Sequence, residues 1–279
     1  MNISINIPYL LPFVITASTA ILIEYIIPWL LSLTYFQMSV SPLRKLLYHC
    51  IDNSGHGIIA SVTWLMIRYV YHKERFMVLF ITELRSLNWN NQLLSSLSIY
   101  NVVFSGVIAC LLDLDHFLIA NTFTLEDALN LNRRPFGHSI TFIIVICTIL
   151  YSLQYIVLWY IQPSSTSSLS ILPIATNTTP PNSYTVILCT VLSYLWILVF
   201  TAWFTHQLRD SIRRGLWFYP IGTTSSIPFS IYSIIIGCIP YIMEKILQYH
   251  NYQYPGLMNN VYITNDNNLV KYINKENDL

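Results

Sequence analysis

Residues 139–161 read SITFIIVICTILYSLQYIVLWYI, a run that contains no charged side chain. A bilayer core of about 30 Å needs about 20 mostly apolar residues in a helix, so this run is long enough to cross it. Further runs of this kind lie near residues 8–36, 54–71, 93–112, 184–205 and 227–248. The sequence therefore predicts an all-α fold, a polytopic membrane helix bundle with about six transmembrane helices.

The composition of the whole chain leads to the same class of protein. Of its 279 residues, 54% are hydrophobic and only 10% are charged, whereas soluble domains carry about 25% charged residues. Disorder is excluded, because disordered chains are poor in apolar and aromatic residues. A net charge of +1 without a concentrated basic patch gives no indication of nucleic-acid binding. We expect an integral membrane protein whose first partner is the lipid bilayer.

We expect one transmembrane helical domain over residues 1–249, followed by a polar tail over 250–279 that is rich in Asn, Asp and Lys. The start of the chain lacks the charged region and cleavage site of a secretory signal, so 8–36 is predicted to be a retained helix. Glu24 within it should face protein or a cavity, since an exposed acid at membrane depth is costly. Pro28 should kink or end this helix.

Six spans place the connecting segments on two faces. The segments 37–53, 113–138 and 206–226 share one face and carry most of the basic residues. These basic residues are Arg44, Lys45, Arg133, Arg134, Arg209, Arg213 and Arg214. The positive-inside rule predicts that this face is cytoplasmic. The motif at Asn177 is a glycosylation acceptor pattern on the opposite face. The membrane compartment is left open.

Acidic and histidine side chains gather at the helix ends of the predicted cytoplasmic face. They are Asp52, His56, Asp113, Asp115, His116, His138, His206 and Asp210. Asp52 and His56 are four residues apart, as are His206 and Asp210, so each pair shares a helix face. Imidazole and carboxylate groups without thiolates are the ligands that zinc or manganese accepts. The pattern predicts one polar cluster, drawn from four helices, with the donors of a divalent metal site.

Four blocks of this sequence resemble the transmembrane protein 267 family. In order, they begin at Asp52, Asp113, Arg133 and His206, and the similarity spans roughly residues 50–230. They read Asp52-Asn53-Ser54-Gly55-His56, Asp113-Leu114-Asp115-His116-Phe117, Arg133-Arg134-Pro135-Phe136-Gly137-His138-Ser139 and His206-Gln207-Leu208-Arg209-Asp210-Ser211-Ile212-Arg213-Arg214-Gly215-Leu216-Trp217. This resemblance implies a membrane fold and no assigned activity.

The same order more distantly resembles the YdjM-type membrane-bound metal-dependent hydrolases. The residues that fall on the motif positions of that family are His56, Asp113, Asp115, His116, Arg134, His138, Ser139, His206 and Asp210. Arg133 stands where that pattern has a histidine, and Gly137 stands where it has a threonine. The resemblance implies a metal-dependent hydrolase, although a cation at position 133 would weaken metal binding.

The first hypothesis is a hydrolase at the cytoplasmic membrane face that acts on a phosphoester or lipid-like substrate. Its predicted metal ligands are His56, Asp115, His116, His138, His206 and Asp210. A bound divalent metal would acidify a water molecule. Asp113 would act as general base, and Arg134 and Arg213, with Arg209 as a further candidate, would stabilise the developing anion.

The alternative hypothesis is a non-catalytic scaffold or assembly protein. In that case Asp113, Asp115 and Asp210 would pair with Arg133, Arg134 and Arg213, and the histidines would cap these pairs. A transporter is less favoured, because the polar groups gather at one interface and not at the midplane, where transporter sites lie.

Overall fold

A computed structural model describes residues 7–37, 42–72, 99–121, 127, 131, 134–161 and 183–253. Arg133, Asn177 and the polar tail beyond residue 253 lie outside these residues. The described helices are α1 (Ile7–Gln37), α2 (Pro42–His72), α5 (Ile99–Leu111), α6 (Asp115–Ala120), α8 (Ile140–Ile161), α9 (Ser183–Arg214) and α10 (Phe229–Gln253), with short 3-10 turns η2 (Leu112–Leu114) and η3 (Phe136–His138). The all-α prediction is confirmed.

Four of the described helices are long and apolar enough to cross a bilayer. Their spans are Leu10–Ser32, Ile99–Ala120, Ile140–Val157 and Phe229–Tyr249. The two helices that carry half of the polar cluster, α2 and α9, are 31 and 32 residues long and therefore also exceed the bilayer thickness. Many large apolar side chains on the outer faces are exposed, among them Ile144, Leu153 and Ile234. The protein is an integral membrane protein with several membrane-spanning helices.

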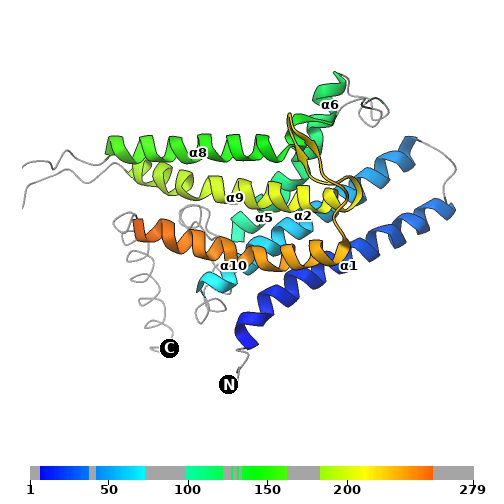
Figure 1. Ribbon diagram of the computed structural model, residues 1–279, viewed down its shortest axis with the longest axis horizontal. Coiled ribbons are helices and arrows are strands. Elements are labelled where there is room, and N and C mark those ends of the chain that lie inside the picture. The colour runs from blue at the N-terminus through cyan, green and yellow to red at the C-terminus, as the bar shows by residue number, and fades with distance from the viewer. Residues whose placement is uncertain are drawn as a thin grey trace, which may run out of the picture.

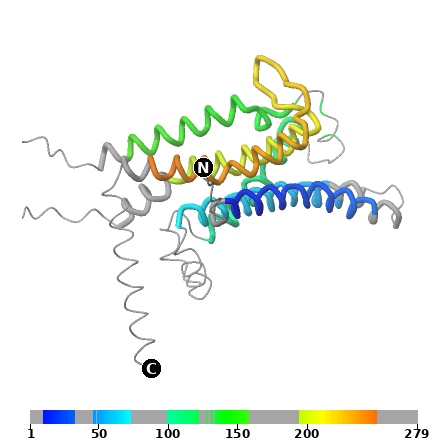
Figure 2. Tube along the Cα trace, turned by 60° about the horizontal axis from the view of Figure 1, so that its bottom comes forward, coloured from blue at the N-terminus to red at the C-terminus, as the bar shows by residue number. Residues whose placement is uncertain are grey.

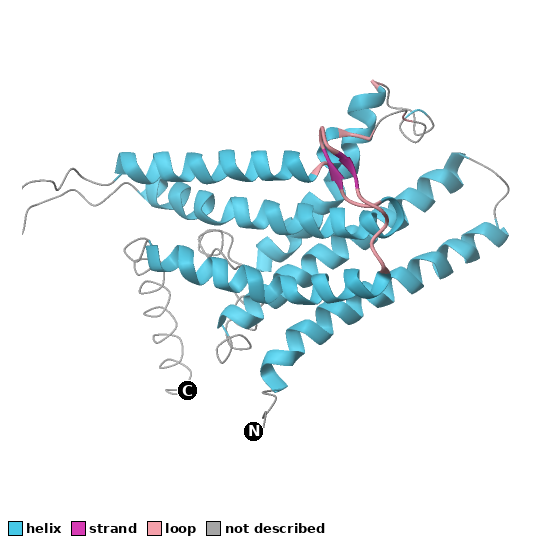
Figure 3. Cartoon of the chain, in the orientation of Figure 1, coloured by secondary structure: helices cyan, strands magenta, loops and turns pink. Residues whose placement is uncertain are grey.

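The main helices form a bundle of two layers (Figure 1). In Figure 2, α1 and α2 lie side by side in one layer, and α8, α9 and α10 form the other. Figure 3 shows how little of the described chain is not helical. Its one described sheet is a small antiparallel hairpin of β1 (Trp217–Phe218) and β2 (Gly222–Thr223). Between the layers, a core of buried apolar side chains includes Trp64, Ile197 and Tyr232.

Several helices extend further than the sequence indicated. α2 begins at Pro42, so Asp52 lies within the helix and is not its N-cap. α1 continues through Pro28, so the proline does not end the helix. α9 continues to Arg214, which places His206 and Asp210 inside its last turns. The segments expected to be loops on the cytoplasmic face are therefore partly helical, and the polar side chains on them have fixed directions.

Two glycines let α2 and α5 pack closely against each other. A Cβ atom on Gly106 of α5 would lie 2.9 Å from the carbonyl oxygen of Gly57 on α2, and one on Gly57 would lie 3.1 Å from the carbonyl oxygen of Gly106. Beside this crossing, Asn53 Nδ2 donates to the carbonyl of Cys110 at 2.9 Å. Small residues at a crossing let helices in a membrane pack backbone to backbone. The crossing fixes α2 against α5 directly beside His56 and about two turns before Asp113.

Candidate metal centre

The structure brings the predicted cluster residues together at one end of the bundle. His56 comes from α2, Asp113 from η2, Asp115 and His116 from the start of α6, His138 from η3, and His206 and Asp210 from α9. His56 and His206 are almost completely buried. The convergence expected from the sequence is therefore present among the described residues.

Four atoms of this cluster have the spacing of metal ligands. They are His138 Nε2, His206 Nε2, Asp113 Oδ1 and Asp210 Oδ2. His138 Nε2 lies 3.2 Å from Asp113 Oδ1, 3.3 Å from His206 Nε2 and 3.7 Å from Asp210 Oδ2. His206 Nε2 lies 3.5 Å from Asp113 Oδ1 and 3.9 Å from Asp210 Oδ2. Ligands about 2.0–2.2 Å from a tetrahedral zinc lie about 3.3–3.6 Å from one another. The set fits a single divalent ion.

In both His138 and His206, the nitrogen that faces away from the cluster, Nδ1, has the kind of partner that a metal-binding histidine has. His206 Nδ1 lies 2.9 Å from the carbonyl oxygen of Ala109, which can only accept, so this nitrogen carries the proton. His138 Nδ1 lies 3.1 Å from Asp115 Oδ2. Metal-binding histidines generally donate their second N–H to a carbonyl or carboxylate, which fixes the ring and its tautomer. Both Nε2 atoms are thus directed into the cluster.

Asp113 and Asp115 each lie where the sequence predicts the other acid. Asp115, predicted as a ligand, lies behind His138, while Asp113, predicted as a base, lies among the four donor atoms. The two acids approach opposite nitrogens of one ring, Asp113 from η2 and Asp115 from the start of α6.

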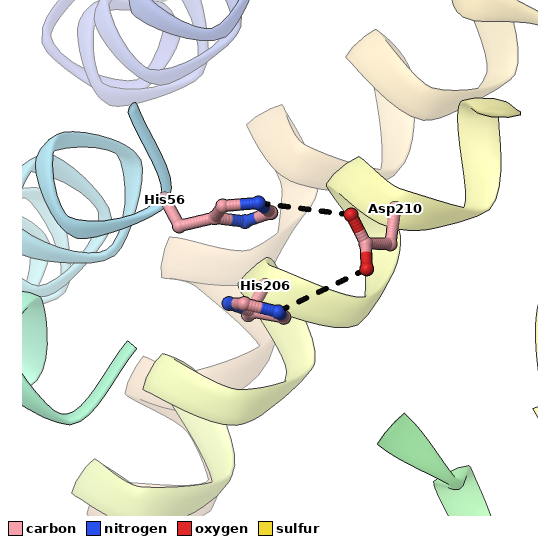
Figure 4. A group of neighbouring side chains, drawn as sticks. All are labelled: His56, His206 and Asp210. Carbon is pink, nitrogen blue, oxygen red and sulfur yellow. Dashed lines mark ion pairs between the residues drawn. The ribbon is translucent and has the colours of Figure 1, made fainter. Parts of the chain in front are cut away.

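His56 and His116 flank the four-atom set. His56 stacks on His206 with 3.8 Å between ring centroids, and its Nε2 lies 3.6 Å from Asp210 Oδ1 (Figure 4). The His116 ring meets that of His138 edge to face at 4.9 Å. His56 joins His206 and Asp210, and His116 joins Asp113 and His138, in groups of three whose donor atoms lie within 4.8 Å of one another. Both residues are therefore further candidate ligands.

The loop before α8 places His138 through contacts with α9. Trp203 Nε1 donates to the carbonyl of Gly137, and Gln207 Nε2 approaches the same oxygen at 3.5 Å. A Cβ atom on Gly137 would collide with the Asp115 carboxylate. The glycine that departs from the hydrolase pattern is therefore needed here, because a threonine would displace the acid that holds His138.

The three arginines assigned to anion stabilisation lie in different surroundings. Arg213 Nη2 bridges Asp210 Oδ1 at 3.1 Å and Asp52 Oδ2 at 3.3 Å, and its side chain remains half exposed. Arg134 donates to the backbone carbonyls of Arg214 and Gly215 at the end of α9. Arg209 is 3% exposed and cannot reach a substrate. The expected role of Arg209 in anion binding is therefore wrong, and Arg213 is the cation nearest to the donor set.

A network of ion pairs connects Glu24, Arg209, Asp52 and Arg213 to Asp210. The sequence did not predict this network. Arg209 Nε donates to Glu24 Oε1 at 2.5 Å and its Nη2 to Asp52 Oδ1 at 2.7 Å. Asp52 in turn holds Arg213, which contacts Asp210. The expectation that Glu24 faces protein is confirmed, and its partner explains how an acid is tolerated at membrane depth. The network joins α1, α2 and α9.

The electrostatics of the cluster favour charged groups. Burial lowers the pKa of His138, but its contacts with Asp113 and Asp115 and the charge of Asp210 raise that pKa to about 10. Burial raises the pKa of Asp210, but His56, His206 and His138 hold it well below its ordinary range. A metal ion would replace the proton on His138 Nε2, since a ligand nitrogen must be deprotonated.

The helices and the cluster define a multi-pass membrane protein with a buried His/Asp centre. The chain is similar to proteins named Transmembrane protein 267. It is 28% identical to the one from Bos taurus over 71% of this chain and 68% of the relative. It is 31% identical to that from Xenopus laevis over 52% and 54%, and 26% identical to that from Danio rerio over 70% and 65%. No family model and no solved structure matches the chain, so the resemblance to the YdjM-type hydrolases stays a prediction.

Proposed function

We propose that this protein binds a divalent metal, zinc or manganese, at the His/Asp cluster and hydrolyses a phosphoester or lipid-like substrate at the cytoplasmic face of a membrane. The observation that carries the proposal is that His138 Nε2 and His206 Nε2 lie 3.2–3.9 Å from each other and from Asp113 Oδ1 and Asp210 Oδ2. A divalent ion there supplies Lewis acidity and lowers the pKa of water.

Side chains of the protein would perform the other steps of the hydrolysis. In hydrolysis of a phosphoester, water adds to phosphorus, the bond from phosphorus to the alcohol oxygen breaks, one water proton reaches the alcohol, and the other stays on the phosphate. Asp113 is 34% exposed, more than Asp210 at 18%, and we assign its Oδ1 to the metal and its second oxygen, Oδ2, to the acceptance of the water proton. Arg213 stabilises the charge on the phosphoryl oxygens, and Arg134 orders the end of α9 beside them.

Metal analysis of the purified full chain tests this proposal. Wild type should retain about one equivalent of metal after removal of loosely bound ions, and His138→Ala and His206→Ala should each lose it, because each removes a donor atom. His72→Ala, which lies at the other end of α2, is the matched control and should retain the metal. Well-folded wild type without metal would exclude the proposed function.

A second candidate function, a non-catalytic membrane scaffold, is favoured by one observation. His138 lies between Asp113 and Asp115, so a protonated ring would offset part of the negative charge of these two carboxylates without a metal. Of the acid–arginine pairs expected for this alternative, only Asp210 with Arg213 occurs among the described residues. Arg134 binds backbone carbonyls instead. The arrangement of His138 and His206 toward a common point is therefore explained better by a metal.

A further inference from the structure

A cavity of about 320 Å³ adjoins the cluster and opens between α2, α6 and the end of α9. His56, Asp113 and Asp210 form part of its wall, so a molecule in it would lie directly against the donor atoms. A second, much smaller cavity lies beside His138 and Arg134. The larger cavity is the place where a substrate would meet the metal.

The lining of the larger cavity includes two arginines beside the acids Asp52, Asp113 and Asp210, and Arg213 is paired with Asp52 and Asp210. Arg213 and Arg214 both line the cavity, and both side chains belong to exposed residues in the last turn of α9. The planar guanidinium group matches phosphate oxygens with two parallel hydrogen bonds. Together with a divalent ion, Arg213 and Arg214 would favour an anion of the size of a phosphate group.

Part of the lining of the cavity is apolar. Leu46, Leu114 and Phe117 line it, and Leu114 is 51% exposed. Leu114 belongs to the membrane span Ile99–Ala120. A wall residue of the cavity is therefore also part of the lipid-facing surface.

The apolar part of the lining continues along the helix as a stripe. Val107, Leu111, Leu114 and Leu118 follow one another at three- to four-residue spacing and are each 46–79% exposed. The stripe leads from the lipid-facing part of α5 to the cavity beside the cluster. A small phosphate ester from water would gain nothing from this surface, whereas an alkyl chain would bury its length against it.

From this juxtaposition we infer that the cavity takes a membrane-resident phosphate ester, with its phosphate between Arg213, Arg214 and the His/Asp cluster and its alkyl chain along the Leu111–Leu114–Leu118 stripe. The inference deepens the proposed function and rests on it for the chemistry, while the binding of the ligand is measured separately. The substrate would reach the site laterally from the bilayer.

Cys50 offers a native reporter, because it is exposed and lines this cavity. The full chain is reconstituted in phosphatidylcholine vesicles that contain either hexadecyl phosphate or hexadecanol, and alkylation of Cys50 by a water-soluble maleimide is followed. Cys50→Ser gives the background from other cysteines. Hexadecyl phosphate should slow the alkylation severalfold, and neither hexadecanol nor inorganic phosphate should do so.

Two variants locate the two parts of the ligand. Arg214→Gln and Leu114→Asn should each weaken the protection about tenfold, which corresponds to about 1.4 kcal/mol of binding. Leu153→Asn on α8 is equally lipid-facing but lies away from the cavity, and should leave the protection unchanged. Metal content and elution volume are recorded for every variant, so a misfolded protein is recognised.

Each outcome separates the two proposals. Metal-loaded protein that hexadecyl phosphate does not protect would overturn the lipid inference and leave the metal site standing. Equal protection by inorganic phosphate would also overturn it, in favour of a soluble phosphate ligand. Metal-free wild type would overturn the proposed function, while protection of Cys50 by the lipid would still support the binding site.

Discussion

Both ring nitrogens of His138 have a carboxylate partner, and this arrangement depends on Asp115 and Gly137. Asp115 receives the Nδ1 proton, and Gly137 leaves the space that the Asp115 carboxylate occupies. A carboxylate behind a metal-binding histidine fixes the ring and strengthens its donor nitrogen. The direction of Nε2 is therefore set by residues that do not themselves belong to the four-atom set.

We predict that Gly137→Ala weakens metal binding roughly 10–100-fold, the usual cost of disturbing such a supporting group. The new methyl group would push the Asp115 carboxylate away from His138. Metal affinity by competition with a chromogenic chelator measures the change. Phe136→Ala, an exposed neighbour in the same turn, serves as control. Unchanged affinity in Gly137→Ala would show that Asp115 does not orient the ring.

For the single residues of the cluster, the sequence predicted which side chains lie together but not which atom each one contacts. Asp113 and Asp115 are two apart, and helical spacing alone cannot say which of them faces His138 Nε2. The position of His138 relative to both acids decides it, and His138 lies on a separate turn, η3, more than twenty residues along the chain. Arg209 was misjudged for a related reason, because its partners Glu24 and Asp52 come from distant helices.

At the scale of the helices, the Gly57–Gly106 crossing sets the distance between α2 and α5 and hence the position of His56 relative to Asp113. We predict that Gly106→Val destabilises the protein by about 1–3 kcal/mol, because the added atoms would meet the Gly57 carbonyl and force the helices apart. Thermal unfolding in detergent measures the effect. Val107→Ala on the exposed face of the same turn should change little, and equal loss in both variants would contradict this account.

Arg209 joins three helices, and its removal leaves two acids without their main partner. We predict that Arg209→Ala costs about 3–5 kcal/mol, the range for breaking a buried ion pair from one side. Adding Glu24→Gln to this variant should recover part of the loss, since one uncompensated charge disappears. Chemical unfolding of the single and double variants provides the comparison. A double variant that is less stable than Arg209→Ala would argue against the pairing.

For the whole molecule, the start of α1 and the end of α10 lie toward one end of the bundle, and the hairpin and α6 lie toward the other (Figure 1). The hydrophobic runs predicted a bundle of long apolar helices, because bilayer thickness fixes helix length, and four helices of the described part of the chain are candidate membrane spans. The runs could not show that α2 and α9 extend past the expected interface, since polar residues at a helix end resemble a loop in sequence.

The orientation in the membrane is testable through Cys50. The excess of arginine and lysine around the cluster predicts that this end faces the cytoplasm. A membrane-impermeant maleimide should therefore leave Cys50 unmodified in intact cells and modify it after permeabilisation, with Cys50→Ser as background. Labelling of Cys50 in intact cells would reverse the orientation.

The central claim is that His138, His206, Asp113 and Asp210 bind one divalent ion. X-ray absorption at the edge of the metal that the purified full chain retains tests it most directly. The account predicts nitrogen and oxygen ligands at about 2.0–2.2 Å, with the outer-shell scattering of at least two imidazoles and no sulfur. His206→Ala should lose this signature. Sulfur ligands at about 2.3 Å, or an imidazole signal unchanged in His206→Ala, would contradict the claim.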